Sequence, residues 1–541
     1  MDSVVVVPEP RNEPVRSYAP GSPERAELEL ELTRMAAEQV ALPHVIGGEH
    51  VTGSGPEVQV VQPHAHAEVL GTLRNAEAAD ATAAIEAAGH AASSWRELSF
   101  EDRAAVFLRA ADLAAGPWRA RLNAATMLGQ SKTVHQAEID AACELIDFWR
   151  YNVHFARQIL ADQPVSSPGT WNRADYRPLE GFVYAVTPFN FTAISGNLPT
   201  APALMGNTVL WKPAHTQQRA ATVVMELLME AGLPPGVINM LTGDGIAVSD
   251  VALTHPDLAG IHFTGSTRVF QLLWSTVGQN LPTYRSYPRV VGETGGKDFV
   301  VAHPSADLDV LRTALVRGAF EYQGQKCSAA SRAYVPESLW RRLRDDLVQT
   351  TESLPQGDVR DLSQFMGAVI DARAYGRLTD VIDQAHQDDR TEVIAGGSYD
   401  DAVGYFVRPT ILEVSDPDHR VLCEEFFGPI LSVHVYRDAD YDAMLTQMES
   451  SAPYALTGSV IAQDRAAVAH ATKALRFAAG NFYVNDKPTG AVVGQQPFGG
   501  ARASGTNDKA GSALNLTRWV SQRVIKETFD PARDWRYPHM G

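Results

Sequence analysis

Short apolar runs separated by amphipathic stretches dominate the chain after residue 180. Five of these runs span residues 182–187, 208–211, 237–241, 260–264 and 289–292. Between them, segments such as 217–231 and 267–278 carry apolar residues at helical spacing. Strands that are apolar on both faces and alternate with helices are typical of a parallel, doubly wound sheet. Right-handed crossovers place the loops after such strands along one edge, and we expect ligands to bind there.

A second alternation of strands and helices follows Glu293 and predicts a second α/β domain. It covers residues 299–302, 314–322, 332–335 and 406–412. The chain before residue 160 is instead rich in alanine and charge and reads mainly as helix. Helices are expected at residues 24–40, 99–113 and 137–160, with typical starts at Ser22-Pro23 and at Ser99.

Two segments fit neither predicted sheet. Residues 168–180 and 516–528 have the composition of extended strands but lie outside both strand–helix alternations. Extended arms of this kind often serve in contacts between subunits, so we expect a homodimer or a higher homo-oligomer.

Composition restricts the class of protein further. The chain has 541 residues, 45% of them hydrophobic and 20% charged, which is typical of a soluble globular protein with several domains. Its net charge of −18 disfavours nucleic acid and anionic membrane surfaces as partners. No apolar run could cross a bilayer, and Asp2 precedes the short run 4–7 where a signal peptide would carry basic residues. We expect an unsecreted protein in a cytoplasm, or in a mitochondrial matrix if the source is eukaryotic.

The three cysteines are odd in number and far apart, so neither a disulfide framework nor a zinc site is expected. Of the three, Cys327 stands out, because Gly324 permits close approach of the backbone and Lys326 places positive charge beside the sulfur. Such surroundings favour the thiolate that attacks carbonyl groups. The alternative is a small buried apolar residue, which is how we interpret Cys143 and Cys423.

Two further residues could complete a catalytic site. Glu293 ends an apolar run and precedes Gly295 and Gly296, so water could reach its carboxylate, as a general base requires. Asn190 directly follows a predicted strand, where its amide could donate a hydrogen bond to a developing oxyanion. The alternatives are a solvated loop glutamate and a turn asparagine that bonds to its own backbone.

Features of a dinucleotide site are present but weak. Lys212 follows a strand and could meet a ribose or phosphate, while Gly265 and Ser266 precede a helix whose free N–H groups could bind an anion. The usual fingerprint with three glycines is absent.

Taken in order, these segments resemble the aldehyde dehydrogenase superfamily. The sequences PFNF, WKPA, FTGS, ETGGK, GQKCSA and EEFFGP recur as a set, and the match covers nearly the whole chain. Within the superfamily, residues 136–147 and 493–508 are most similar to the delta-1-pyrroline-5-carboxylate dehydrogenases, as are 12–15 and 21–25.

The resemblance implies a fold and a division of the chain. It implies a Rossmann-type parallel-sheet cofactor domain, a second α/β catalytic domain and extended oligomerisation arms. The NAD-binding domain would comprise residues 1–166 and 188–294, the catalytic domain 295–510, and the oligomerisation arm 167–187 and 511–541.

The resemblance also implies the roles of single residues. Cys327 would be the nucleophile, Glu293 the general base, and Asn190 an oxyanion donor together with the backbone N–H of Cys327. The cofactor-binding residues would be Thr187, Lys212, Gly265, Ser266, Glu425 and Phe427. The substrate-binding residues would be Glu144, Phe191, Ser328, Gly490, Ala491 and Phe498, although either phenylalanine could equally be core packing.

Three positions depart from the superfamily pattern. Phe270 replaces a glycine common in relatives, and we expect a bulkier wall near the cofactor phosphates. Ala491 replaces a serine, so a hydroxyl donor is lost from the substrate loop. His215 replaces a glutamate that would repel a 2′-phosphate, but NAD is still expected because the most similar family uses it.

The implied reaction is NAD-dependent oxidation of L-glutamate γ-semialdehyde to L-glutamate in proline catabolism, without a metal. This aldehyde is in equilibrium with the cyclic imine Δ1-pyrroline-5-carboxylate. The alternatives are another aldehyde such as succinate semialdehyde, a CoA-acylating dehydrogenase, and a catalytically silent relative. Because no part of the chain is left over for a fused proline dehydrogenase, we expect any such enzyme to be a separate functional neighbour.

Overall fold

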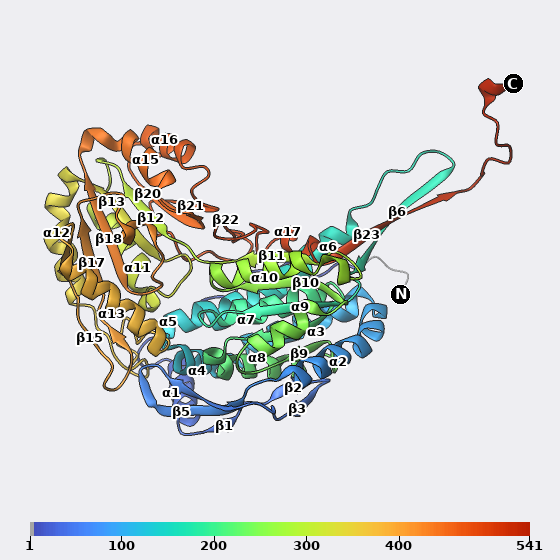
Figure 1. Cartoon of the computed structure of the whole chain (residues 1–541), viewed down its shortest axis with the longest axis horizontal. Coiled ribbons are helices and arrows are strands. Elements are labelled where there is room, and N and C mark those ends of the chain that lie inside the picture. The colour runs from blue at the N-terminus through green and yellow to red at the C-terminus, as the bar shows by residue number, and fades with distance from the viewer. Residues whose placement is uncertain (1–4) are drawn as a thin grey trace.

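The computed structural model describes residues 5–541 and contains two α/β units, each built on a seven-stranded sheet, with a thin arm projecting from one of them (Figure 1). Residues 1–4 lie outside the described residues. They include the start of the first predicted domain, and also Asp2 and Val4, on which the prediction of no signal peptide rests.

The first sheet has the strand order β11-β10-β7-β8-β9-β2-β3. Its strands are β2 (His44–Ile46), β3 (Glu49–Val51), β7 (Phe182–Thr187), β8 (Thr208–Pro213), β9 (Ile238–Met240), β10 (Leu258–Thr264) and β11 (Arg289–Glu293). The pairs from β11 to β9 are parallel, so the five apolar runs are confirmed as neighbouring parallel strands. The antiparallel strands β2 and β3 complete the opposite edge.

Both faces of the central part of this sheet are covered, which explains why its central strands are mainly apolar. In β7, Phe182 and Tyr184 face a core shared with one group of helices, while Val183 and Ala185 face the other group. The first group is α2 (Ala78–Glu97), α9 (Ile246–Thr254) and α10 (Thr267–Gln279). The second includes α1 (Pro23–Ala36), α3 (Phe100–Ala115), α4 (Arg119–Gln130), α6 (Leu145–Ala161), α7 (Thr192–Leu204) and α8 (Gln218–Glu230).

The second sheet has the order β14-β17-β18-β13-β12-β20-β21, parallel except for the edge strand β14. Its strands are β12 (Asp298–Ala302), β13 (Ala330–Pro336), β14 (Thr391–Ala395), β17 (Thr410–Val414), β18 (Ile430–Tyr436), β20 (Thr457–Ile461) and β21 (Asn481–Val484). It is covered by α11 (Leu308–Phe320), α12 (Glu337–Glu352), α13 (Ala372–Gln387), α14 (Arg420–Cys423), α15 (Tyr441–Ser450) and α16 (Arg465–Ala474).

The prediction that the N-terminal part is mainly helical is wrong for residues 40–74. These residues form β2, β3 and a three-stranded sheet of β1 (Val40–Ala41), β4 (Glu57–Gln62) and β5 (Ala65–Arg74). The helix starts are confirmed, because Ser22 accepts a hydrogen bond from the N–H of Arg25 and Ser99 accepts one from Asp102. The first helix ends at Ala36 rather than at residue 40.

The single helix predicted at residues 137–160 is interrupted. The structure has α5 (Val134–Ala137), a π-helix η1 (Glu138–Glu144) and then α6. π-Helical turns are rare and are frequently found at functional sites.

The arm is a two-stranded antiparallel ribbon of β6 (Thr170–Pro178) and β23 (Val520–Thr528), which projects from the molecule in Figure 1. The predicted arm boundaries are too wide. Residues 182–187 are β7, a central strand of the first sheet that is buried on both faces, and so they do not belong to the arm. Residues 513–517 form α17 (Ala513–Thr517), which contacts α6 and buries Leu516.

The remaining elements are short. They are β15 (Tyr399–Asp400) with β16 (Phe406–Val407), β19 (Tyr454–Ala455) with β22 (Ala501–Arg502), and the 3-10 turns η2 (His215–Gln217), η3 (Leu281–Thr283), η4 (Glu321–Gly324), η5 (Asp438–Asp440) and η6 (Pro538–Met540).

Candidate active site

The loop before Cys327 has an unusual backbone. Tyr322, Gln323 and Gly324 follow one another with φ of 51°, 54° and 63°, in the left-handed region that side chains rarely adopt. A Cβ added to Gly324 would lie 2.3 Å from the carbonyl oxygen of Gly428, so only glycine fits there. The buried Gln323 amide fixes the turn through bonds to Ser131 O at 2.9 Å, Ala368 O at 2.7 Å and Gly367 N at 3.0 Å. This turn holds the half-buried Cys327 in place.

The charges around the thiol differ from the sequence prediction. Lys326 was expected to favour the thiolate, but its ammonium bonds to the carboxylate of Glu321 at 3.1 Å. Burial raises the pKa of Cys327 well above its usual range, and the nearby carboxylates of Asp298 and Glu293 raise it further. The expectation about Lys326 is therefore wrong, because its partner is Glu321, and the surroundings of Cys327 favour the thiol over the thiolate.

Asn190 and Glu293 are brought to the nucleophile from the first sheet. Asn190 Nδ2 donates to the carbonyl oxygen of Gln325 at 3.0 Å, and an amide has a second N–H for another acceptor. Glu293 Oε2 accepts from the N–H of Gly500 at 3.2 Å. Burial raises the pKa of Glu293 well above its usual range, partly offset by this bond and by Lys509. A carboxyl with a raised pKa is a stronger base once it has lost its proton.

The paired glycines after Glu293 serve another carboxylate. We predicted that they leave space for water, but a Cβ on Gly295 would lie 2.1 Å from Glu425, and Gly296 N donates to Glu425 Oε1 at 2.8 Å. Burial raises the pKa of Glu425 to about 7. Phe427 follows with a φ of 55°, and its ring packs edge-on to Phe189 at 5.8 Å.

Four of the predicted cofactor residues lie at the carboxyl ends of β7, β8 and β10, on one edge of the first sheet as predicted. The hydroxyl of Thr187 already has two partners inside the protein, because its Oγ1 bonds to Ser195 Oγ at 2.9 Å and to Trp211 Nε1 at 3.0 Å. Ser266 caps α10 by accepting from Val269 N at 3.3 Å.

The N–H of Gly265, which we expected to be free for an anion, donates to the carbonyl oxygen of Glu293 at 3.2 Å. That part of the prediction is wrong. The bond instead joins the start of the α10 loop to the candidate base.

Lys212 is a buried cation with little to neutralise it. Its Nζ donates to Pro213 O at 2.5 Å, and no carboxylate of residues 5–541 lies within ion-pair distance. Burial lowers its pKa to about 8. A buried ammonium with spare donors is suited to ligand hydroxyl or phosphate oxygens.

The sequence did not indicate the exposed apolar side chains of two neighbouring helices. The helices α9 and α10 contact each other and expose four large apolar side chains, Ile246 by 71%, Val269 by 42%, Leu272 by 64% and Trp274 by 49%. Exposed apolar side chains grouped on adjacent helices are a mark of ligand contact.

The substrate residues predicted from the resemblance converge from several loops. Ser328 Oγ bonds to Thr489 Oγ1 at 2.7 Å, which holds Gly490 and Ala491 beside the nucleophile, and Gly490 has a φ of 102°. Thr489 was missed, although it stands directly before the predicted pair in sequence. Phe498 is fixed by two backbone bonds to Ala510 at 3.0 and 2.8 Å.

Phe191 and Glu144 come from the turn before α7 and from the π-helix. Phe191 precedes α7 and its ring contacts Lys132 Nζ at 4.1 Å. Glu144 ends the π-helix, where burial and the charge of Asp140 raise its pKa to about 8. It also acts electrostatically on Cys327.

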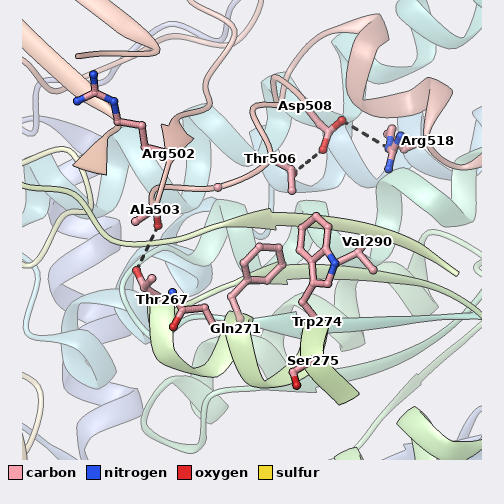
Figure 2. Close-up of a pocket in the computed structure, with 12 residues that line it drawn as sticks. Thr267, Gln271, Trp274, Ser275, Val290, Arg502, Ala503, Thr506, Asp508 and Arg518 are labelled. Carbon is pink, nitrogen blue, oxygen red and sulfur yellow. Dashed lines mark hydrogen bonds and ion pairs between the residues drawn. The ribbon is translucent and has the colours of Figure 1, made fainter. Parts of the chain in front are cut away.

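A separate cleft of about 700 Å³ lies beside α10 and contains none of the predicted catalytic residues. Figure 2 shows it between Gln271 and Trp274 of α10 and a C-terminal segment in which Asp508 joins Thr506 to Arg518. Phe270 lines this cleft, with its ring stacked on Phe263 at 5.5 Å and against Gly292. The bulky ring of Phe270 thus packs against β11, the outermost strand on one side of the first sheet.

Two classes of feature were not found within residues 5–541. No helix there is long and apolar enough to cross a bilayer. No group of three or more histidine, cysteine or acidic side chains there is arranged to hold a metal ion.

A thiol, a buried carboxylate and an amide donor thus meet where two α/β units face each other. The chain belongs to the aldehyde dehydrogenase family, whose model matches residues 50–525. It is 49% identical over 530 residues to the mitochondrial delta-1-pyrroline-5-carboxylate dehydrogenase of Mus musculus, covering 98% of this chain and 94% of that protein.

Solved structures give the same picture. The chain is similar to the delta-pyrroline-5-carboxylate dehydrogenase from Mycobacterium tuberculosis bound with NAD, at 64% identity, a TM-score of 0.97 and full coverage of both chains. It also matches proline utilization A from Bdellovibrio bacteriovorus at 31% identity and a TM-score of 0.91, covering 98% of this chain and 55% of that one.

Proposed function

We propose that this protein oxidises L-glutamate γ-semialdehyde, the open form of Δ1-pyrroline-5-carboxylate, to L-glutamate with NAD. The observation that carries the proposal is the bond between Ser328, next to the nucleophile, and Thr489, which sets the Gly490–Ala491 loop beside the thiol. The names of the similar proteins support the same substrate.

The chemistry follows from three side chains. The thiol of Cys327 gives its proton to water, and the sulfur attacks the aldehyde carbon. The resulting oxyanion accepts hydrogen bonds from the free N–H of Asn190 and from the backbone N–H of Cys327. One oxyanion donor is typically worth about 3–4 kcal/mol in the transition state. Bound NAD supplies the acceptor for the hydride that leaves the thiohemiacetal carbon. Glu293 then takes a proton from water, whose oxygen attacks the thioester on Cys327 and releases the carboxylate product.

The residues at the sheet edge fit a dinucleotide. Lys212 would bind ribose or phosphate oxygens, since it has no carboxylate partner among the described residues, and Ser266 would bind at the start of α10. The exposed Ile246, Val269 and Leu272 would cover the adenine. Gly265 would allow close approach, and Thr187 would act through its backbone, because its hydroxyl is already bonded.

Glu425 and Phe427 would meet the nicotinamide riboside. Glu425 has one carboxylate oxygen on Gly296 N, so its other oxygen can accept from a ribose hydroxyl. Burial lowers the pKa of His215, which therefore adds no positive charge that would favour a 2′-phosphate.

Lys212→Met should raise the KM for NAD by about ten- to hundredfold, because a hydrogen bond from a charged donor is worth about 1.5–3 kcal/mol. The KM for the aldehyde should change less than threefold. Steady-state kinetics with each substrate varied in turn measure both values. An equal rise in the two KM values would contradict the assignment of Lys212 to the cofactor.

The substrate would lie between the Gly490–Ala491 loop on one side and Phe191 with Glu144 on the other. Ser328 and the backbone of Gly490 and Ala491 would bind the α-carboxylate. Phe191 and Phe498 would flank the aliphatic chain, with Glu144 near the aldehyde end. Lys487, whose ammonium lies close to Gly490, adds positive charge for the same carboxylate.

The deciding experiment follows NADH formation by the purified protein with Δ1-pyrroline-5-carboxylate, succinate semialdehyde and propanal. We expect kcat/KM for Δ1-pyrroline-5-carboxylate to exceed the others by about a hundredfold or more, because loss of a recognised polar group leaves buried partners unpaired. Equal or better rates with the simpler aldehydes would retain the thiol mechanism and remove the substrate assignment.

We further propose a homodimer or a higher homo-oligomer. The ribbon of β6 and β23 projects from its own subunit and exposes apolar side chains, including Trp171 by 50% and Val524 by 60%, which a second copy would cover. A reducing compartment suits the free thiols, so we place the enzyme in a bacterial cytoplasm or a mitochondrial matrix. A separate proline dehydrogenase would supply its substrate.

A further inference from the structure

A fully buried lysine lies behind the catalytic loop. Lys132 follows Ser131, the left-handed residue that ends α4, and is 1% exposed. Its Nζ lies 2.5 Å from Asp140 Oδ2, 4.1 Å from the ring centroid of Phe191 and 4.5 Å from that of Tyr322. A cation placed over two aromatic faces in a desolvated site is held by each of them.

The three groups that Lys132 contacts belong to different parts of the site. Besides the lysine, the carboxylate of Asp140 accepts from the N–H groups of Thr192 at 3.0 Å and Ala193 at 2.8 Å, the first turn of α7. Phe191 and the oxyanion donor Asn190 immediately precede that turn. Tyr322 begins the left-handed run that leads to Cys327. Lys132 therefore joins the oxyanion side to the nucleophile side.

Stability alone does not explain such a pair. Replacing a buried ion pair by apolar residues is often neutral or stabilising, because burying two charges costs desolvation. The other charges that face Lys132 are Glu144, from the π-helix, and Lys326, from the nucleophile loop, so the lysine also stands among the charges of the site.

We propose that Lys132 is a positioning residue, which fixes the Asn190–Phe191 turn against the Tyr322–Cys327 loop by contacting Phe191, Tyr322 and Asp140 at once. It does not touch the reacting atoms. The inference rests on the proposed function only in taking Cys327 and Asn190 as the reacting pair.

The test uses a double variant, Lys132→Met with Asp140→Asn. It removes both charges together, and the asparagine oxygen can still accept from Ala193 N, while the N–H of Thr192, which bonds to the other oxygen of Asp140, loses its acceptor. The Tm should stay near that of the wild-type enzyme. The kcat with Δ1-pyrroline-5-carboxylate should fall about hundredfold, the cost of misplacing reacting groups by about 1 Å.

Two probes of the thiol separate positioning from loss of the nucleophile. p-Nitrophenyl acetate acylates a thiol through an oxyanion and needs neither NAD nor the semialdehyde, so p-nitrophenolate release should fall as far as kcat. Iodoacetamide alkylates the thiol without forming an oxyanion, so its rate with Cys327 should change less than threefold. Tyr322→Leu keeps the ion pair and should show the same selective loss, about tenfold.

The matched control is Arg119→Met with Glu138→Gln. This pair joins α4 to the π-helix and is equally buried. Its other contacts include Glu13, Pro14, Arg16 and Tyr18 of the N-terminal segment, with Asn123 and Cys143 beside them. We expect its rates to stay within about threefold of the wild type.

Wild-type ester acylation by the Lys132/Asp140 double variant would overturn the proposal, and so would an equal loss of alkylation. If the double variant does not fold, the proposal is tested with Tyr322→Leu, using the same two probes, p-nitrophenyl acetate and iodoacetamide. A wild-type enzyme that releases p-nitrophenolate but does not oxidise Δ1-pyrroline-5-carboxylate would remove the proposed function and leave this test intact.

Discussion

Cys327→Ala should reduce NADH formation on the order of 10⁴-fold or more, as expected when a covalent nucleophile is removed. Without the sulfur no thiohemiacetal can form, and Asn190 and Glu293 have no intermediate to stabilise or hydrolyse. The Kd for NAD should remain within about threefold, since Lys212 and the helices α9 and α10 lie on the other unit. Stopped-flow absorbance measures the first quantity and titration calorimetry the second.

The control for this variant is Cys143→Ala. Cys143 is 6% exposed, and its sulfur lies 3.6 Å from Arg119 NH2 and 3.8 Å from the carbonyl oxygen of Pro14. We expect some loss of stability and nearly unchanged kcat. If Cys327→Ala also loses NAD binding while its Tm is unchanged, the placement of the cofactor on the first sheet edge is wrong.

Glu293→Gln should separate acylation from hydrolysis. Glutamine keeps an oxygen to accept from Gly500 N, but it cannot take a proton from water. Removing a general base typically costs about 10²–10⁴-fold. We expect one equivalent of NADH to form in a burst, followed by a steady rate lower by that factor, with the acyl-enzyme visible by intact-protein mass spectrometry.

The competing outcome for Glu293→Gln is a slow first turnover without a burst. That result would mean that the carboxylate acts before hydride transfer, as the acceptor of the thiol proton. The structure makes this a real alternative, since burial raises the pKa of the Cys327 thiol and the charge of Glu293 raises it further.

Much of the fold could be predicted because the central strands are buried on both faces. The runs that became β7, β8 and β10 are apolar at most of their buried positions, and strand length separates them from helices. The strands β1 to β5 were missed, since they are mostly short, have mixed polarity and lie in a small sheet or near one edge of the first sheet. The π-helix was missed because it adds one residue to a turn without altering the helical composition.

The candidate site was predicted residue by residue only where motifs carry it. The motifs placed Cys327 and Glu293, but inferences from sequence neighbours failed, because the partner of Lys326 is Glu321 and the paired glycines accommodate Glu425. Nothing in the sequence around Lys132 indicated a role in the candidate site. The lysine lies 195 residues before Cys327, and only the folded chain brings it to the loop.

The arm has a consequence for biosynthesis. β6 pairs with β23, and Asp175 meets Arg523 across 348 residues of sequence. At about 5–20 residues per second, a ribosome needs about 20–70 s to deliver the second strand after the first. During that interval β6 is an unpaired edge, which invites aggregation. The charges of Arg173, Asp175 and Arg177 along this strand are of the kind that protects a waiting edge on a nascent chain.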